Sequence, residues 1–283
     1  MAVTNFVPDI WSARILQNLS RVSVASAVCN RDYEGDTTIG DSVKITSITD
    51  PTISTYSGAD LTLEDIDDAT QSLALDQKKY FNFYLDDVEK AQSVSGGAIM
   101  QSAIDRASYG LANTLDAYVL ALLGAGASAS APDHQVAEAT INTAAGAYDS
   151  LVNWNVLLDN ADVPVENRYA IITPALYAYL LKDSRFVGAG DDVSASTRAN
   201  GRVGQAAGLD IYKSNNLADG PGAGAGKLMI VGSRYSTTLA EQIRSVEAFR
   251  VEKKFGDGVK GLHVYGAKVT RSTGLVAADV IVS

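Results

Sequence analysis

The glycine-rich segment 220–228, GPGAGAGKL, is the first stretch that could do chemistry, because glycine loops ending in lysine bind nucleotide phosphates. That motif needs glycine six residues before the lysine and serine or threonine after it. Pro221 and Leu228 occupy these two positions. The motif also opens a helix, whereas the following residues, KLMIVG, are typical of a buried strand. A flexible loop is therefore the favoured interpretation.

Nucleophilic or metal chemistry would depend on two histidines and one cysteine. His134 lies in a loop rich in alanine, serine and proline, and His263 alternates within a predicted strand. Cys29 is the only cysteine, which excludes an internal disulfide and agrees with a reducing interior. A Cys–His nucleophile pair or a histidine-rich metal site is hard to build from this inventory. We expect His134 on a surface loop and His263 on a strand face.

The acidic run within 60–68 could ligate Ca²⁺ or Mg²⁺, but it lacks the regular oxygen spacing and central glycine of a known cation loop. A solvated ribbon tip, or a partner for a basic patch on a neighbour, fits it better. The adjacent pairs Asp67-Asp68 and Asp86-Asp87 are typical of caps and turns, not of acid/base dyads. The acidic residues of the run are Asp60, Glu64, Asp65, Asp67 and Asp68.

An aromatic series follows the acidic run and could stack nucleic-acid bases. Nearby basic residues cluster only at Lys78-Lys79, so strand packing is the better interpretation. The series is Tyr80, Phe81, Phe83 and Tyr84. The sequence therefore predicts no catalytic, cofactor-binding or metal site.

Composition narrows the function classes. The chain has 283 residues, is 46% hydrophobic and 20% charged, and can bury a large core as one or two domains. Its net charge of −10 argues against binding nucleic acid through phosphates and suits a protein made at high concentration. The longest apolar run, 118–127, is too short to span a membrane, and the start shows no secretory signal.

The elements that would position these residues begin with an arm and a ribbon. Residues 5–29 predict an arm with one short amphipathic helix. Strands are predicted at 42–48, 52–58 and 72–85. A ribbon of this kind is at best marginally stable alone, so it must lie on another surface, in the same subunit or a neighbour.

A helical pattern over 86–123 is the strongest periodic signal, with a kink expected at Gly96-Gly97. A second helix is predicted over about 135–159, a buried strand at 168–174 and a short helix at 174–183. Residues 184–227, which are rich in glycine, alanine and serine, predict a loop region. The segment GLDIYKSNNL at 208–217 interrupts it. Strands are then predicted at 227–232, 244–255, 260–271 and 274–282, with a turn at the GDG of 256–258. The fold class expected is α+β.

Four segments in order also resemble a known family: FVPDIWSARILQNL, NRDYEGDTTIGDSVKI, NGRVGQAAGLDIYKSNNL and LHVYGAKVTR. They are similar to the major capsid (coat) proteins of tailed bacteriophages, which have the Hong Kong ninety-seven type fold. The similarity is closest to the coat proteins of short-tailed phages and covers almost the whole chain.

The resemblance implies a division of the chain. Residues 1–34 would form the N-terminal arm and 35–85 the extended β-ribbon loop. Residues 86–134 and 236–283 would form the peripheral domain with its long spine helix, and 135–235 the α/β axial domain. The ribbon would then clasp a neighbouring subunit, and apolar residues such as Val43, Ile45, Phe81 and Phe83 would be buried only between subunits.

The resemblance implies a non-enzymatic shell protein in the virion capsid, made in the host bacterial cytoplasm. Its partners would be further copies of itself in pentamers and hexamers, a separate scaffolding protein, a portal and, on some shells, a decoration protein. The shell would enclose double-stranded DNA without sequence-specific binding, and no membrane is involved.

Departures from the family limit what can be carried over. The length leaves no room for the large inserted domain of some members. Lys44, Lys78 and Lys79 lie in the ribbon, but nothing identifies a partner for a covalent cross-link. The alternatives are an encapsulin-like compartment that holds cargo enzymes, a carboxylate-based hydrolase and a surface adhesin. The missing secretion signal disfavours the adhesin.

Overall fold

The computed structural model describes residues 24–33, 42–48, 53, 55, 68–88, 96–127, 134–183, 202–224, 226–252 and 254–283. The predicted arm helix before residue 24, most of the 52–58 strand and the acidic run up to Asp67 lie outside these residues. The elements are α1 (Ala25–Val28), β1 (Ser42–Ile48), β2 (Asp68–Ala74), β3 (Gln77–Asp86), α3 (Gly96–Gly126), β4 (Gln135–Ile141), α4 (Ala144–Asn160), β5 (Arg168–Ile172), α5 (Pro174–Leu180), β6 (Arg202–Ala206), β7 (Leu209–Lys213), β8 (Lys227–Ser233), η2 (Arg234–Ser236), β9 (Thr237–Arg250), β10 (Gly256–Val269), η3 (Ser272–Gly274) and β11 (Leu275–Val282).

A six-stranded sheet forms one half of the molecule, with the order β4-β11-β8-β5-β7-β6. Its central strand β5 is buried at all five residues, as expected for an apolar run covered on both faces. Helix α4 packs against β8 and β11, and it begins where the Thr143 side chain accepts a hydrogen bond from the Gly146 N–H. Leu151, Trp154 and Leu158 point from α4 into the core at helical spacing.

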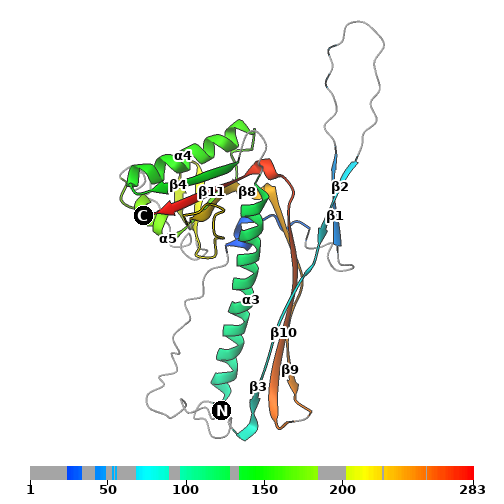
Figure 1. Ribbon diagram of the computed structural model, residues 1–283. Coiled ribbons are helices and arrows are strands. Elements are labelled where there is room, and N and C mark those ends of the chain that lie inside the picture. The colour runs from blue at the N-terminus through cyan, green and yellow to red at the C-terminus, as the bar shows by residue number, and fades with distance from the viewer. Residues whose placement is uncertain are drawn as a thin grey trace.

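A long three-stranded antiparallel sheet, with the order β3-β10-β9, extends away from this half (Figure 1). Helix α3 runs beside it and contacts β10, where the rings of Tyr118 and Tyr265 meet edge to face at 5.7 Å between centroids. The C-terminal end of α3 also contacts β8 and β11. This helix therefore joins the two halves of the molecule. Within the described part of the chain, no helix has the length and apolar character needed to cross a membrane.

The ribbon β1–β2 rests on the three-stranded sheet. Val43 and Ile45 pack with Leu73, Ala240 and Val264 in a second, smaller core cluster. These apolar side chains are buried within their own subunit. The expectation that Val43 and Ile45 are buried only between subunits is therefore wrong.

Gly266 explains how β2 crosses β10 so closely. A Cβ at this position would overlap the backbone carbonyl oxygen of Ala74. Lys268 Nζ donates a hydrogen bond to the Ser72 carbonyl at 2.8 Å, and Gln71 Nε2 donates one to the Thr270 carbonyl at 3.3 Å. The base of the ribbon is thus attached to its own sheet by both apolar and polar contacts.

Several predicted elements are confirmed and others need correction. The strands predicted at 42–48, 168–174, 227–232 and 274–282 and the helix after Pro174 are all present. Of the helix predicted over 86–123, the structure describes α3 from Gly96, whereas Asp86 still belongs to β3 and pairs with Gly256 of β10; residues 89–95 lie outside the described residues. The helix predicted over 135–159 is a strand up to Ile141, and α4 begins only after its Thr143 cap. The GDG segment opens β10 instead of forming the turn.

The terminal segment 236–283 is divided between the two sheets. Strands β9 and β10 pair with each other, whereas β11 lies between β4 and β8 in the six-stranded sheet. Six consecutive residues from Leu275 to Val280 are buried, which requires a strand covered on both faces. The C-terminal strand therefore belongs with the elements of 135–235 and not with β9 and β10.

Candidate functional site

The glycine-rich loop uses its N–H groups to bind carboxylates of the same chain. Gly222 N–H donates to Asp279 Oδ2 at 2.8 Å, and Gly224 N–H donates to Glu138 Oε2 at 3.0 Å. Strand β8 follows the loop, as its sequence predicts. The N–H groups that a phosphate would need thus bind side chains of β11 and β4.

The two histidines and the cysteine have separate environments. His134 is fully buried, and its Nδ1 lies 2.9 Å from the Leu275 carbonyl oxygen, so the surface-loop prediction for His134 is wrong. His263 lies in β10 with its Nε2 2.9 Å from Glu241 Oε2. Burial, with a smaller effect of Asp116, raises the pKa of the Cys29 thiol to about 12, so it is a poor nucleophile at neutral pH. Among the residues that the structure describes, no three His, Cys, Asp or Glu side chains are arranged to hold a metal ion.

Asp86 and Asp87 lie where β3 ends and contact neighbouring groups there. Asp86 Oδ1 accepts a hydrogen bond from the Val88 N–H at 2.8 Å, and Asp87 forms an ion pair with Arg250. The Asp86 contact is local, as expected for a carboxylate at a turn, whereas the Asp87 pair connects the end of β3 to β9. Of the predicted acidic run, Asp68 is the first residue of β2, and the remaining carboxylates lie outside the described residues.

The aromatic series on β3 divides between the two faces of the sheet. Phe81 and Phe83 stack with 5.8 Å between ring centroids, which confirms strand packing for these two residues. Tyr80 and Tyr84 project to the other face and are 77% and 48% exposed. Packing is the wrong prediction for these tyrosines, because the face of β3 that carries them stays exposed within the subunit.

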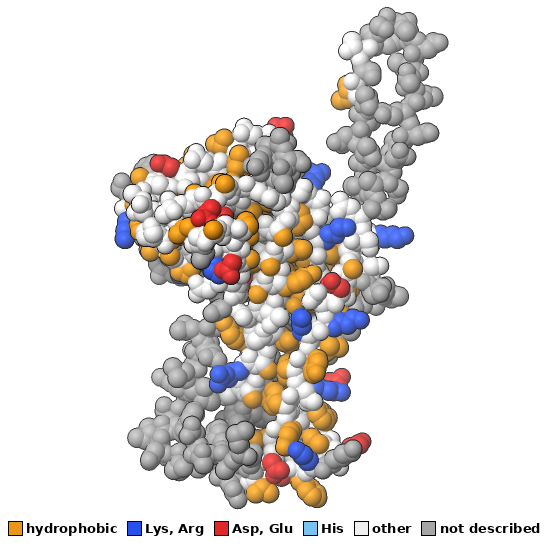
Figure 2. All heavy atoms as spheres, in the orientation of Figure 1, with side chains coloured by type: hydrophobic (Ala, Val, Ile, Leu, Met, Phe, Trp, Pro, Cys, Tyr) orange, Lys and Arg blue, Asp and Glu red, His pale blue; other side chains and the backbone are white. Residues whose placement is uncertain are grey.

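Exposed apolar side chains extend from the middle of the three-stranded sheet to its end beyond Asp86 and Gly256, and we call this group the distal apolar surface. Tyr80 lies opposite Leu262 in the β3–β10 register, and the Asp87 N–H bonds the Phe255 carbonyl. Hydrophobic side chains are visible along this long sheet in Figure 2. The surface consists of Tyr80 (77% exposed), Tyr84 (48%), Val88 (60%), Phe255 (80%) and Leu262 (38%). Concentrations of exposed apolar groups of this kind mark interaction sites on soluble proteins.

Positive charge borders the distal apolar surface. Lys254 Nζ lies 4.7 Å from the centroid of the Tyr84 ring and 3.0 Å from its hydroxyl oxygen. Lys260 lies 5.9 Å from the Phe249 ring centroid and pairs with Glu247 at 2.9 Å. An apolar centre with a charged border has the composition of a protein–protein interface and not of a catalytic cleft.

Asp116 is a structural residue that the sequence reasoning did not identify. It is 2% exposed, and its Oδ1 accepts hydrogen bonds from the Val24 and Ala25 N–H groups at 2.8 and 2.9 Å. Asn216 Nδ2 donates to Oδ2 at 3.0 Å. Asp116 therefore fixes the start of α1 against α3. The available signal was a carboxylate between Leu115 and Val119 on the apolar side of the predicted helix.

Comparisons with known proteins show the same fold in phages. The model of the phage capsid protein family matches residues 69–278. A structure from Mycobacterium phage Che8 is 27% identical with a TM-score of 0.75, and the match covers 98% of each chain. The capsid of cyanophage P-SCSP1u is 19% identical with a TM-score of 0.72, covering 100% of this chain and 95% of the other. The capsid of Ralstonia phage GP4 is 12% identical with a TM-score of 0.71, covering 99% and 97%. No curated protein matches this chain.

Proposed function

Because this chain belongs to the phage capsid protein family, we propose that it is the major capsid protein of a tailed phage and assembles through pentamers and hexamers into an icosahedral shell. The family gives it a structural role in a phage capsid, and its α+β fold matches those of phage capsid structures. The type would be that of the Hong Kong ninety-seven fold, in the branch of the short-tailed phages. Such a subunit carries out no catalysis.

The distal apolar surface is the observation that best supports assembly. Five large apolar side chains stay exposed on or beside the three-stranded sheet, which α3 contacts at β10 and β3. A subunit that works alone would lose solubility through such a surface, whereas a shell subunit buries it against another copy. Ile53, in the segment between β1 and β2, is 98% exposed and adds a further apolar contact residue.

The charge supports a shell that encloses DNA without condensing it. The net charge of −10 opposes tight binding to phosphates, so the inner surface would not trap the genome during packaging. In the proposed assembly a separate scaffolding protein sets the shell size, a portal admits the double-stranded DNA, and synthesis takes place in the host cytoplasm.

Electron microscopy of the purified chain tests this proposal. The protein, produced alone and together with its scaffolding partner, should form closed shells or rings of five and six subunits. Sedimentation velocity should show the same particles in solution. A compact monomer at every concentration and in both preparations would contradict the proposal.

A further inference from the structure

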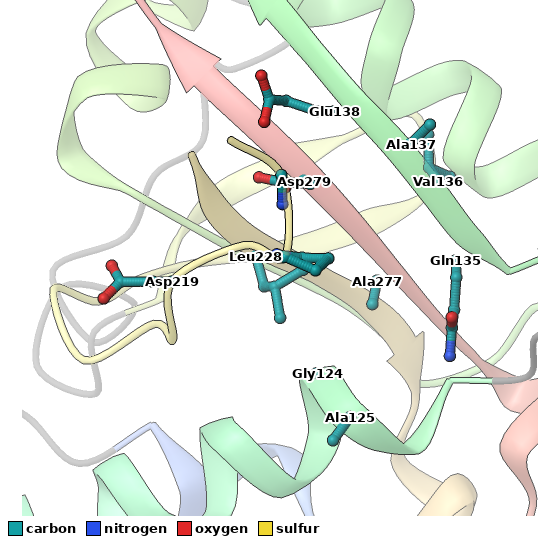
Figure 3. A pocket seen from close by; sticks show the side chains of 12 residues that line it. Gly124, Ala125, Gln135, Val136, Ala137, Glu138, Asp219, Leu228, Ala277 and Asp279 are labelled. Carbon is teal, nitrogen blue, oxygen red and sulfur yellow. The ribbon is translucent and has the colours of Figure 1, made fainter. Parts of the chain in front are cut away.

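A cavity of about 570 Å³ lies between the C-terminal end of α3, β4, β11 and the glycine-rich loop. Its floor is apolar and includes Leu228 and Ala277. Two carboxylates, Glu138 from β4 and Asp279 from β11, lie close together on one side, and Asp219 lies farther away (Figure 3). The proposed function assigns no role to this cavity.

Asp279 is the unusual member of the pair. Asp279 is only 2% exposed, and it lines the cavity. Oδ2 accepts a hydrogen bond from the Gly222 N–H, but Oδ1 is buried without a hydrogen-bond partner. Burying a carboxylate oxygen without a protein donor is costly, because the protein does not replace its hydrogen bonds to solvent.

Glu138 brings a second negative charge to the same place. A Cβ at Gly222 would overlap Glu138 Oε2 and lie 2.7 Å from Asp279 Oδ2, so the two carboxylates flank one glycine. Each receives one N–H from the loop. Two carboxylates this close repel each other unless a cation or a shared proton compensates them.

Lys227, beside the cavity-lining Leu228, does not compensate the pair. It forms its ion pair with Asp219, and both side chains reach solvent. Within the described part of the chain, neither Glu138 nor Asp279 forms an ion pair with lysine, arginine or histidine. The negative charge of the two carboxylates can therefore attract a cationic ligand.

We propose that the carboxylates of Asp279 and Glu138 bind a divalent cation of the calcium class in this cavity. Calcium accepts six to eight oxygen ligands in irregular geometry, so backbone carbonyl and water oxygens can complete a site that has only two carboxylates. Magnesium requires near-ideal octahedral geometry and suits such a site less well. The bound ion would connect β4, β11 and the loop before β8.

Calorimetry and thermal unfolding of the full chain test the site, with CaCl₂ compared against MgCl₂ and against NaCl of equal ionic strength. Calcium at about 100 times its dissociation constant should raise Tm by roughly 5–10 °C. Glu138→Gln and Asp279→Asn should each weaken calcium binding at least about tenfold, because each removes one of two charged ligands. Glu138 is exposed, so its variant should fold normally even if the Asp279 variant does not.

Asp219→Asn is the matched control, because Asp219 lines the same cavity but pairs with Lys227. It should bind calcium as tightly as the parent chain. Equal Tm values in CaCl₂ and NaCl, or unchanged calcium binding in Glu138→Gln, would overturn the proposal. A Tm that rises on acidification to pH 5 without any effect of calcium would also overturn it and would show that the pair shares a proton instead.

Discussion

A central strand of one sheet and an edge strand of the other bury their residues to opposite extents. Strand β5 of the six-stranded sheet is buried at every one of its five residues, whereas β3 of the three-stranded sheet is buried at none of its ten, although it is rich in aromatics. The main core lies around the six-stranded sheet and α4, and the cluster under the ribbon is much smaller. The comparison indicates that β5 contributes to the stability of the subunit with every residue, whereas β3 leaves most of its side chains at least partly exposed.

The largest difference should appear when one residue is truncated in each half. Ile171→Ala removes a fully buried side chain from the centre of β5 and should lower the free energy of unfolding by about 2–5 kcal/mol. Tyr80→Ala removes a larger side chain that is 77% exposed and should change it by less than about 0.5 kcal/mol. Urea unfolding followed by circular dichroism measures both. Similar losses in the two variants would mean that this face of β3 is part of the subunit core.

The crossing of β2 over β10 provides the next test. Gly266→Ala places a Cβ against the Ala74 carbonyl and should destabilise the subunit by about 1–3 kcal/mol, because backbone must move. Gly110→Ala is the control, since its Cβ meets no atom within 4 Å in the middle of α3. It should stabilise the protein by about 0.5–1 kcal/mol. If Gly266→Ala were neutral, the ribbon base would not be held as closely as the structure indicates.

The sequence predicted the elements whose pattern is local. The apolar run before Pro174 and the run 274–282 could each be recognised as buried strands without knowledge of their neighbours. The family resemblance, carried by four separate segments, also predicted the capsid fold correctly. These predictions succeeded because period and motif are properties of contiguous residues.

Properties that depend on distant partners could not be predicted. His134 looks like a loop residue in the sequence and is buried only because β11 passes next to it. The sequence shows no core for Val43 and Ile45, because the Val264 and Ala240 that cover them are some two hundred residues away in the chain. The carboxylates around the glycine loop come from β4 and β11, so their convergence appears only in three dimensions.

A smaller effect is expected from the buried thiol. Burial raises the Cys29 pKa from 9.0 to about 12 in the folded protein. Between these values the unfolded chain loses the proton first, so the free energy of unfolding should decrease as pH rises from about 9 to 12, with the full contribution present below pH 9. Cys29→Ala should make this decrease shallower. A smaller decrease should remain, because burial also raises the pKa of Tyr169. The midpoints of denaturant unfolding at pH 8, 9.5 and 10.5 measure this decrease. If the midpoint fell equally with pH in the parent chain and in Cys29→Ala, the buried thiol would not be its cause.

Sedimentation velocity of a distal-surface variant tests the central claim most directly. Tyr80→Ser combined with Phe255→Ser removes two exposed apolar side chains and should leave the unfolding midpoint unchanged, while particles give way to free subunits. Val165→Ser, which changes a 69% exposed residue outside the long sheet, should assemble like the parent chain. If the double variant assembles as well as Val165→Ser, the distal apolar surface is not an assembly contact and the account is wrong.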